Sequence, residues 1–188
     1  MKWRIESKLS GFLVLVAVIP VWEFISRAEL VNPLFFPPMS KILRSFFLLV
    51  LSGDLPYQIL LSLKRAAAGY LLAALVFIPL GIAMGLYPWV YRLLEVVIEM
   101  ARPIPPPAIV PVAMLFFGLG DEMKIFVIFF SCAWPILLNT YDGVRNIDRV
   151  LIDTARTFGL SRRRMIARVV VPAASPQIMT GLRVSLAI

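Results

Sequence analysis

The sequence contains no histidine and a single cysteine, Cys132. Without histidine the chain lacks the commonest general base, the commonest metal ligand and the usual proton-relay side chain. One cysteine cannot form an intramolecular disulfide, and because Cys132 lies in an apolar stretch we expect it to fill a small interior space. No Gly-Lys-Ser or Gly-Lys-Thr phosphate loop occurs, so the chain does not bind ATP by that device. These absences predict neither a metal site nor a cluster of catalytic residues.

Charged residues are also scarce. They make up 16% of the 188 residues, whereas 60% are hydrophobic and the mean hydropathy is +0.87. Soluble domains are roughly 45–50% apolar, so this composition indicates a protein of the lipid bilayer. The net charge of +8 comes from basic residues that flank long apolar runs. Such a distribution is typical of cytoplasmic loops and predicts no nucleic-acid partner.

Four apolar segments satisfy the requirement of about 20 residues for a membrane-spanning helix. We interpret the chain as a single transmembrane domain, 1–188, with spans at about 9–26, 66–86, 103–120 and 125–141. The first is expected to be a retained helix, because no small-residue cleavage site follows it as in a signal peptide. Glu23, near its outer end, is expected to be a solvated carboxylate at the interface. The segment Met39–Leu51 predicts an amphipathic helix at the membrane surface, with Lys41 and Arg44 on its polar side.

Two spans carry residues that modify helix geometry. The third contains five prolines, which remove backbone donors and break regular helix: Pro103, Pro105, Pro106, Pro107 and Pro111. Non-helical backbone at that depth requires protein or a water-filled cavity around it. Two interpretations stay open, since the prolines either line a pathway or shape a re-entrant bend. In the second span, the spacing of Gly81 and Gly85 predicts close packing against another helix.

Basic residues predict the orientation. The segment after the fourth span carries seven arginines, namely Arg145, Arg149, Arg156, Arg162, Arg163, Arg164 and Arg168. They place that segment in the cytoplasm. Four spans then return the N-terminus to the cytoplasm, together with Lys2, Arg4 and Lys8, and leave the tip around Asp121 outside. Lys64 and Arg65 disagree with the rule, because they fall on the outer side.

The basic segment itself is patterned. Four apolar positions recur at helical spacing and predict an apolar helix face: Leu151, Ile152, Ala155 and Phe158. Gly159 permits the positive φ that ends a helix, and Ser161 can cap a second helix, which we expect to stop at Pro172. The residues alone leave two interpretations open. The segment is either a docking surface or a basic loop that holds the membrane topology.

A resemblance favours docking. The stretch "DTARTFGLSRRRMIARVVVP" resembles the cytoplasmic signature of ABC importer permeases: Glu-Ala-Ala, three residues, Gly, nine residues, then Ile-x-Leu-Pro. Asp, Thr and Ala at 153–155, Gly159, two valines and Pro172 occupy the matching positions, and the departures are conservative. In that family this loop forms the coupling helix, which sits in a groove of the ATPase subunit. The resemblance therefore implies an ATPase-coupling role for Asp153, Thr154, Ala155, Phe158, Gly159, Leu160 and Pro172.

A second resemblance narrows the group. The stretches "SLKRAAAGYLLAALVFIPLGIAMGL", "ARPIPPPAIVPVAMLFFGLGDEMKIF" and "FFSCAWPILLNTYDGV" are similar, in order, to permeases of the nitrate, sulfonate and taurine type. The likeness extends over nearly the whole chain from residue 9. It implies an all-α permease bundle in a bacterial-type inner membrane, with four full spans, a cytoplasmic coupling loop at about 142–180 and the start of a fifth span at 181–188. Arg183 is expected at the membrane boundary. Because family members continue further, we expect the sequence to be a C-terminally truncated permease.

The same resemblance implies the function. The chain would be the permease subunit of an ATP-driven, binding-protein-dependent importer for a small solute such as nitrate, a sulfonate or taurine. It would be no enzyme and would bind no cofactor, since ATP and Mg²⁺ belong to the ATPase subunits. Its other expected partners are an extracytoplasmic solute-binding protein and a second permease subunit, forming a homodimer. A secondary transporter driven by an ion gradient is the alternative, disfavoured because no span carries a charged residue at mid-membrane depth.

Overall fold

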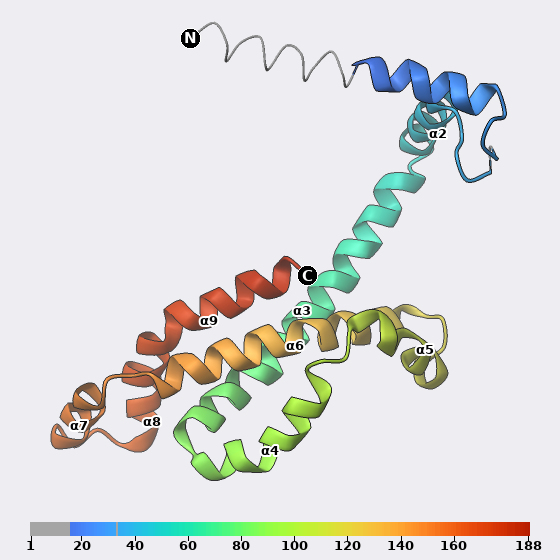
Figure 1. Cartoon of the computed structure of the whole chain (residues 1–188). Helices are drawn as coiled ribbons and strands as arrows, with labels where there is room; N and C mark the ends of the chain where they lie inside the picture. Colours follow the sequence, from blue (N-terminus) through green and yellow to red (C-terminus); the bar gives the residue numbers. More distant parts are fainter. Residues whose placement is uncertain (1–15, 33) are drawn as a thin grey trace, which may run out of the picture. The chain divides into compact units, whose positions relative to one another are not determined.

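The computed structural model describes residues 16–32 and 34–188 (Figure 1). All regular secondary structure in these residues is helical, which confirms the predicted all-α class. The first part of the predicted span 9–26, together with Lys2, Arg4 and Lys8, lies outside the described residues. The chain divides into two compact units, Met1–Leu61 and Ser62–Ile188, and each is described by itself.

In the first unit, residues 16–27 are helical and α2 spans Met39–Leu51, the bounds that the sequence predicts. The connection between the two helices packs on Trp22. Its ring stacks on Phe36 with ring centres 4.4 Å apart, and its Nε1 donates a hydrogen bond of 3.0 Å to the carbonyl oxygen of Pro37. The exposed apolar residues of α2 include Phe47. Such a surface suits a helix that lies in a membrane interface.

Glu23 stabilises the start of α2. Its carboxylate accepts hydrogen bonds from the backbone N–H of Ser40 at 3.0 Å and from the Ser40 hydroxyl at 2.7 Å, and Arg27 lies 2.6 Å away. Ser40 is in the first turn of α2, where backbone N–H groups have no partner within the helix. A negative charge there also complements the helix dipole. The carboxylate is therefore bonded to its neighbours, and its side chain is only 24% exposed.

In the second unit, the part of α3 (Asp54–Leu86) from Ser62 onward packs against α6 (Asp121–Arg145) through glycines. A Cβ atom added to any of three glycines of α3 would approach a side chain of α6 closer than real Cβ atoms do. In chain order, Gly69 lies against Ile128, Gly81 against Thr140 and Gly85 against Val144, with separations of 2.8, 2.7 and 2.6 Å from that added atom. The residue numbers of the contacting pairs increase in the same direction along both helices, so α3 and α6 run parallel.

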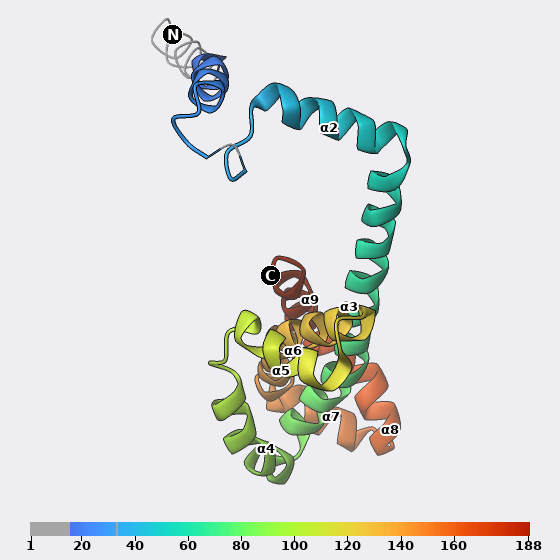
Figure 2. The same cartoon turned by 90° about the vertical axis from the view of Figure 1, so that its right-hand side faces the viewer.

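The last helix, α9 (Val171–Leu186), runs antiparallel to α6 and lies beside it in both Figure 1 and Figure 2. Here too glycines allow close approach: Gly143 of α6 lies against Gln177, and Gly181 of α9 lies against Pro135. Further along, the buried Cys132 thiol is 3.6 Å from the carbonyl oxygen of Ser185. Cys132 thus fills an interior space, as predicted.

The position of Arg183 differs from the prediction. Gly181 and Ser185, on either side of it, lie level with Pro135 and Cys132. These two residues are near the centre of the uncharged part of α6, residues 125–141. Arg183 is therefore level with the middle of α6, and its predicted place at the membrane boundary is wrong. The reason is that α9 packs on α6 from Ala174 onward, where the Ala174 carbonyl lies against Gly143, and this is earlier than the sequence indicates.

The prolines of the third predicted span lie at a sharp bend. Helices α4 (Pro88–Ala101) and α5 (Pro106–Phe117) meet at an angle of 99° across residues 102–105. Pro106 and Pro107 start α5, where the missing N–H groups would have no helical partner in any case. The 12 residues of α5 advance about 18 Å, which is short of a bilayer core of about 30 Å. The bent pair joins the Gly85 end of α3 to Asp121 at the start of α6, which lies beside Arg65 at the other end of α3. It therefore carries the chain from one end of α3 back to the other, as a broken span does, whereas a re-entrant bend would return to the side that it left.

Two described helices, α3 and α6, are long and apolar enough to cross a membrane, and the bent pair α4–α5 would add a third if it is one span. The chain is therefore a multi-pass membrane protein. Arg65 of α3 pairs with Asp121 at the start of α6, with 2.7 Å between guanidinium and carboxylate. This pair gives Arg65 a counter-charge at the end of the bundle that the sequence assigns to the outside.

Breaking this pair should lower stability. Arg65→Asp would place two carboxylates side by side, and we expect a loss of about 1–2 kcal/mol in unfolding free energy, because the Arg65 side chain is only 18% exposed. Thermal unfolding in detergent measures it. The double variant Arg65→Asp/Asp121→Arg should recover part of the loss, and Lys64→Asp, at an exposed neighbour, is the control. Equal unfolding midpoints for Arg65→Asp and Lys64→Asp would show that the pair contributes nothing.

Candidate functional site

The signature segment begins with α7 (Arg149–Thr157), a helix closed at both ends by local hydrogen bonds. At its start, the Asp148 carboxylate accepts a hydrogen bond of 2.9 Å from the backbone N–H of Val150. At its end, Gly159 has a φ of +69°, and the N–H of Leu160 donates to the carbonyl of Ala155 at 3.2 Å. This is the Schellman arrangement, which needs a left-handed residue. The predicted positive φ at Gly159 is confirmed.

The chain then continues as one helical run through α8 (Arg162–Met165), the π-helical turn η1 (Ile166–Val170) and α9. Ser161 precedes this run, although its side chain makes no capping hydrogen bond. The prediction that the second helix stops at Pro172 is wrong. A proline lacks the N–H of a regular turn and its ring clashes with the carbonyl four residues earlier. The wider i→i+5 turn directly before Pro172 lets the helix pass it.

Helix α7 has two faces with different surroundings. On the outer face, Val150, Leu151 and Phe158 are 69%, 44% and 79% exposed. On the inner face, Ile152 packs with the buried cluster that joins the ends of α6 and α9, and Ala155 is buried. Ile152 thus anchors the helix to the bundle while the outer face stays uncovered. An apolar surface of this kind on a polar segment is typical of a protein contact.

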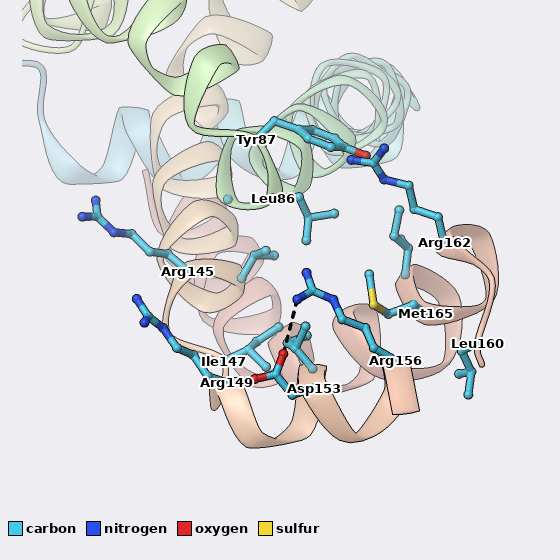
Figure 3. Close-up of a pocket in the computed structure, with 14 residues that line it drawn as sticks. Leu86, Tyr87, Arg145, Ile147, Arg149, Asp153, Arg156, Leu160, Arg162 and Met165 are labelled. Carbon is cyan, nitrogen blue, oxygen red and sulfur yellow. Dashed lines mark hydrogen bonds and ion pairs between the residues drawn. The ribbon is translucent and has the colours of Figure 1, made fainter. Parts of the chain in front are cut away.

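A basic cleft of about 730 Å³ lies between the inner face of α7 and the ends of α3 and α6 (Figure 3). Its charged lining comprises Arg145, Arg149, Asp153, Arg156 and Arg162. The dashed line in Figure 3 marks the pair between Asp153 and Arg156, 3.3 Å apart. The Arg162 guanidinium lies 4.5 Å from the ring centre of Tyr87, a cation–π contact that ties α8 to the end of α3. Movement of α7 and α8 is therefore linked to the bundle on two sides.

The predicted coupling residues do not share one environment. Six of the seven lie in the single unit formed by α7 and its C-terminal turn, residues 153–160, whereas Pro172 lies on α9. Phe158 is on the outer face, Asp153 lines the cleft, and the Thr154 hydroxyl donates to the carbonyl of Val150 at 2.7 Å. The sequence pattern missed the Arg162–Tyr87 contact, because it joins elements far apart in the chain.

The fold and this site define a class: a multi-pass helical membrane protein in which α7 exposes an apolar face beside the bundle. Such a face is typical of a transport subunit that binds another protein. Residues 77–188 match the family described as binding-protein-dependent transport system inner membrane component. The chain belongs to this family and is a permease subunit of an importer of the ABC class, which is a transport protein and not an enzyme.

Individual relatives agree. A putative ABC transporter permease protein of Methanocaldococcus jannaschii is 41% identical, over 95% of this chain and 68% of the relative. The taurine transport system permease protein of Escherichia coli is 34% identical, over 100% of this chain and 70% of the relative. The bicarbonate transport system permease protein of Synechococcus elongatus is also 34% identical, over 98% and 70%. These similarities lend no support to the alternative of a secondary transporter. The sequence argument against that alternative was that no span carries a charged residue at mid-membrane depth, and the position of Arg183 removes this argument.

Proposed function

We propose that this permease imports a small solute that carries an oxyanion group, such as a sulfonate, bicarbonate or nitrate. The proposal is supported by the names of its relatives, one of which transports taurine and another bicarbonate. Taurine carries a sulfonate, and both solutes present several oxygen atoms that share one negative charge. An extracytoplasmic binding protein delivers the solute, and two copies of the permease form the path through the membrane.

The energy comes from a separate ATPase subunit that holds ATP and Mg²⁺, and the permease itself needs no cofactor. In this proposal the outer face of α7, with Leu151 and Phe158, docks on the ATPase. The observation that carries it is that these apolar side chains are exposed at the position of the family signature. Ile152 and the Arg162–Tyr87 contact then pass the movement of α7 and α8 to the ends of α3, α6 and α9.

Uptake by purified components tests the proposal. Proteoliposomes that contain the permease and its ATPase, with ATP inside and the binding protein outside, should accumulate one of four radiolabelled solutes: taurine, butane-1-sulfonate, bicarbonate or nitrate. Accumulation should require ATP and survive collapse of the ion gradients by ionophores. Accumulation without ATP, or its loss on adding ionophores, would contradict the proposal and restore the secondary transporter.

In the proposed orientation, α7 and the N-terminus of the chain lie in the cytoplasm. In a Cys132→Ser background, cysteine at Gly120 should react with a membrane-impermeant thiol reagent added to intact cells, because this residue precedes α6 at the outer end. Cysteine at Arg163, which is exposed on α8, should react only after the membrane is opened. Wild-type protein and the Cys132→Ser background are the labelling controls. The reverse pattern would invert the orientation.

A further inference from the structure

Arg183 is a charged residue at a depth where charge is costly. Its neighbours Gly181 and Ser185 lie level with Pro135 and Cys132, near the middle of the 25-residue, span-length helix α6. Ionisable side chains at that depth almost always face a bundle interior or a water-filled cavity, and they mark ion and substrate pathways.

The Arg183 side chain does not face α6. The buried residues of α9 share one helix face, formed by Ala174, Ile178, Gly181 and Ser185. Since each residue advances about 100°, Arg183 points about 160° away from both Gly181 and Ser185, and it is exposed. It is absent from the ion pairs of the described residues, which join Arg27 to Glu23, Arg65 to Asp121 and Arg156 to Asp153. Its charge therefore needs a partner from outside this part of the molecule.

The cleft on the neighbouring side of α9 does not suit an anion. It has a volume of about 490 Å³ and touches α9 at Val184. Its charged lining is mainly acidic, with Glu95, Glu99 and Asp142 against Arg102. Carboxylates repel an oxyanion, whereas the guanidinium of Arg183 has the planar fork of donors that fits one. The charge pattern thus favours the Arg183 face over this cleft as the surface that an anionic solute meets.

We propose that Arg183 lines the solute pathway and contacts the oxyanion group of the solute as it crosses the membrane. The inference rests on the proposed function for the nature of the solute. One guanidinium at mid-depth attracts the anion into the path, and a single charge-assisted contact remains weak enough for release, as conduction requires. The Arg183 face of α9 is then wetted, which removes the cost of a charge in lipid.

Charge-graded variants test the contact in the proteoliposome assay described above. Arg183→Gln should reduce the maximal ATP-driven uptake rate about 10-fold or more, because a charge-assisted hydrogen bond to the solute is lost. Arg183→Lys, which keeps the charge without the fork, should retain more uptake than Arg183→Gln, and Arg183→Glu should retain less. Arg168→Gln is the matched control, since it removes an exposed arginine from the same helical run outside the span.

Water access gives a second readout, in which thiol labelling is measured without transport and uptake is measured afterwards. In the Cys132→Ser background, Arg183→Cys should react with a water-soluble, positively charged thiosulfonate in the assembled complex. The attached cation should also restore part of the uptake, which a neutral thiosulfonate of similar size should not. Ile178→Cys, buried against α6, is the control and should not react.

The outcomes separate the two proposals. If the wild type accumulates none of the four solutes with ATP, the proposed function fails. If the wild type transports but Arg183→Gln matches Arg168→Gln, the inference about Arg183 fails. The inference also fails if Arg183→Cys does not react with the thiosulfonate. It fails as well if all three Arg183 variants lose folded protein alike, because Arg183 would then be a structural residue paired with a carboxylate elsewhere in the complex.

Discussion

Phe158→Asp should nearly abolish ATP-driven uptake while the permease still inserts in the membrane. Phe158 is 79% exposed on the outer face of α7 and makes no part of the buried clusters of the described chain, so its loss should not unfold the bundle. An apolar anchor at the centre of a protein contact is worth about 2 kcal/mol or more, so we expect the affinity of the ATPase to fall about 30-fold. Co-purification with the ATPase and uptake in proteoliposomes measure the effect.

Phe158→Leu is the matched control, because it keeps an apolar side chain at the same place. It should retain most of the ATPase binding and uptake. Thermal unfolding of the isolated permease should be the same for both variants. If Phe158→Asp co-purifies with the ATPase at wild-type yield, the outer face of α7 is not the docking surface.

Gly81→Leu should cause the largest loss of stability. A single added Cβ atom would lie 2.7 Å from the Thr140 Cβ and 2.9 Å from the Leu137 carbonyl oxygen, and the backbone of α6 cannot yield as a flexible side chain would. Overpacking of a close helix contact costs about 3 kcal/mol, or more where two backbones meet. For a chain of this size that corresponds to a fall of about 10 °C in the unfolding midpoint, measured in detergent.

Gly120→Leu is the control for this prediction. Gly120 lies just before α6, and an added Cβ atom there would meet nothing within 4 Å. Its φ of −76° is open to any residue, so the substitution adds the same side chain without a clash or backbone strain. A midpoint for Gly81→Leu as high as that of Gly120→Leu would show that α3 and α6 are not closely packed in the membrane.

Composition and periodicity predicted the elements whose cause is local. The bounds of α2, the helical character of the apolar segments and the left-handed turn at Gly159 follow from neighbouring residues, and all are confirmed. The family signature located α7 in the chain. Helical spacing grouped Ile152 with Phe158 on one apolar face, yet the structure packs Ile152 against the bundle and leaves Phe158 exposed. Only the packing of distant segments decides which apolar residue is covered.

The remaining differences between sequence and structure have two origins. Arg65 contradicted the charge rule until Asp121, which starts a helix 56 positions later, supplied its counter-charge. Pro172 was expected to end a helix because the local rule takes no account of a wider turn before it. Arg183 was placed at the boundary because the sequence does not show where α9 first touches α6. The cases of Arg65 and Arg183 needed a contact between segments that are remote in the chain, whereas the case of Pro172 needed only the geometry of the turn before it.

The wide turn at Ile166–Val170 also sets the rotational phase of the helix that contains it. One additional residue in a turn offsets every later side chain by about 100° relative to a continuous α-helix. The run from Arg162 to Leu186 can therefore direct Arg162 at Tyr87 while its small residues, such as Gly181, stay seated on α6. In an uninterrupted α-helix, seating one end would turn the other away by that angle. The turn thus fixes a rotation of about 100° between the side chains at the basic end of the run and those at its membrane end.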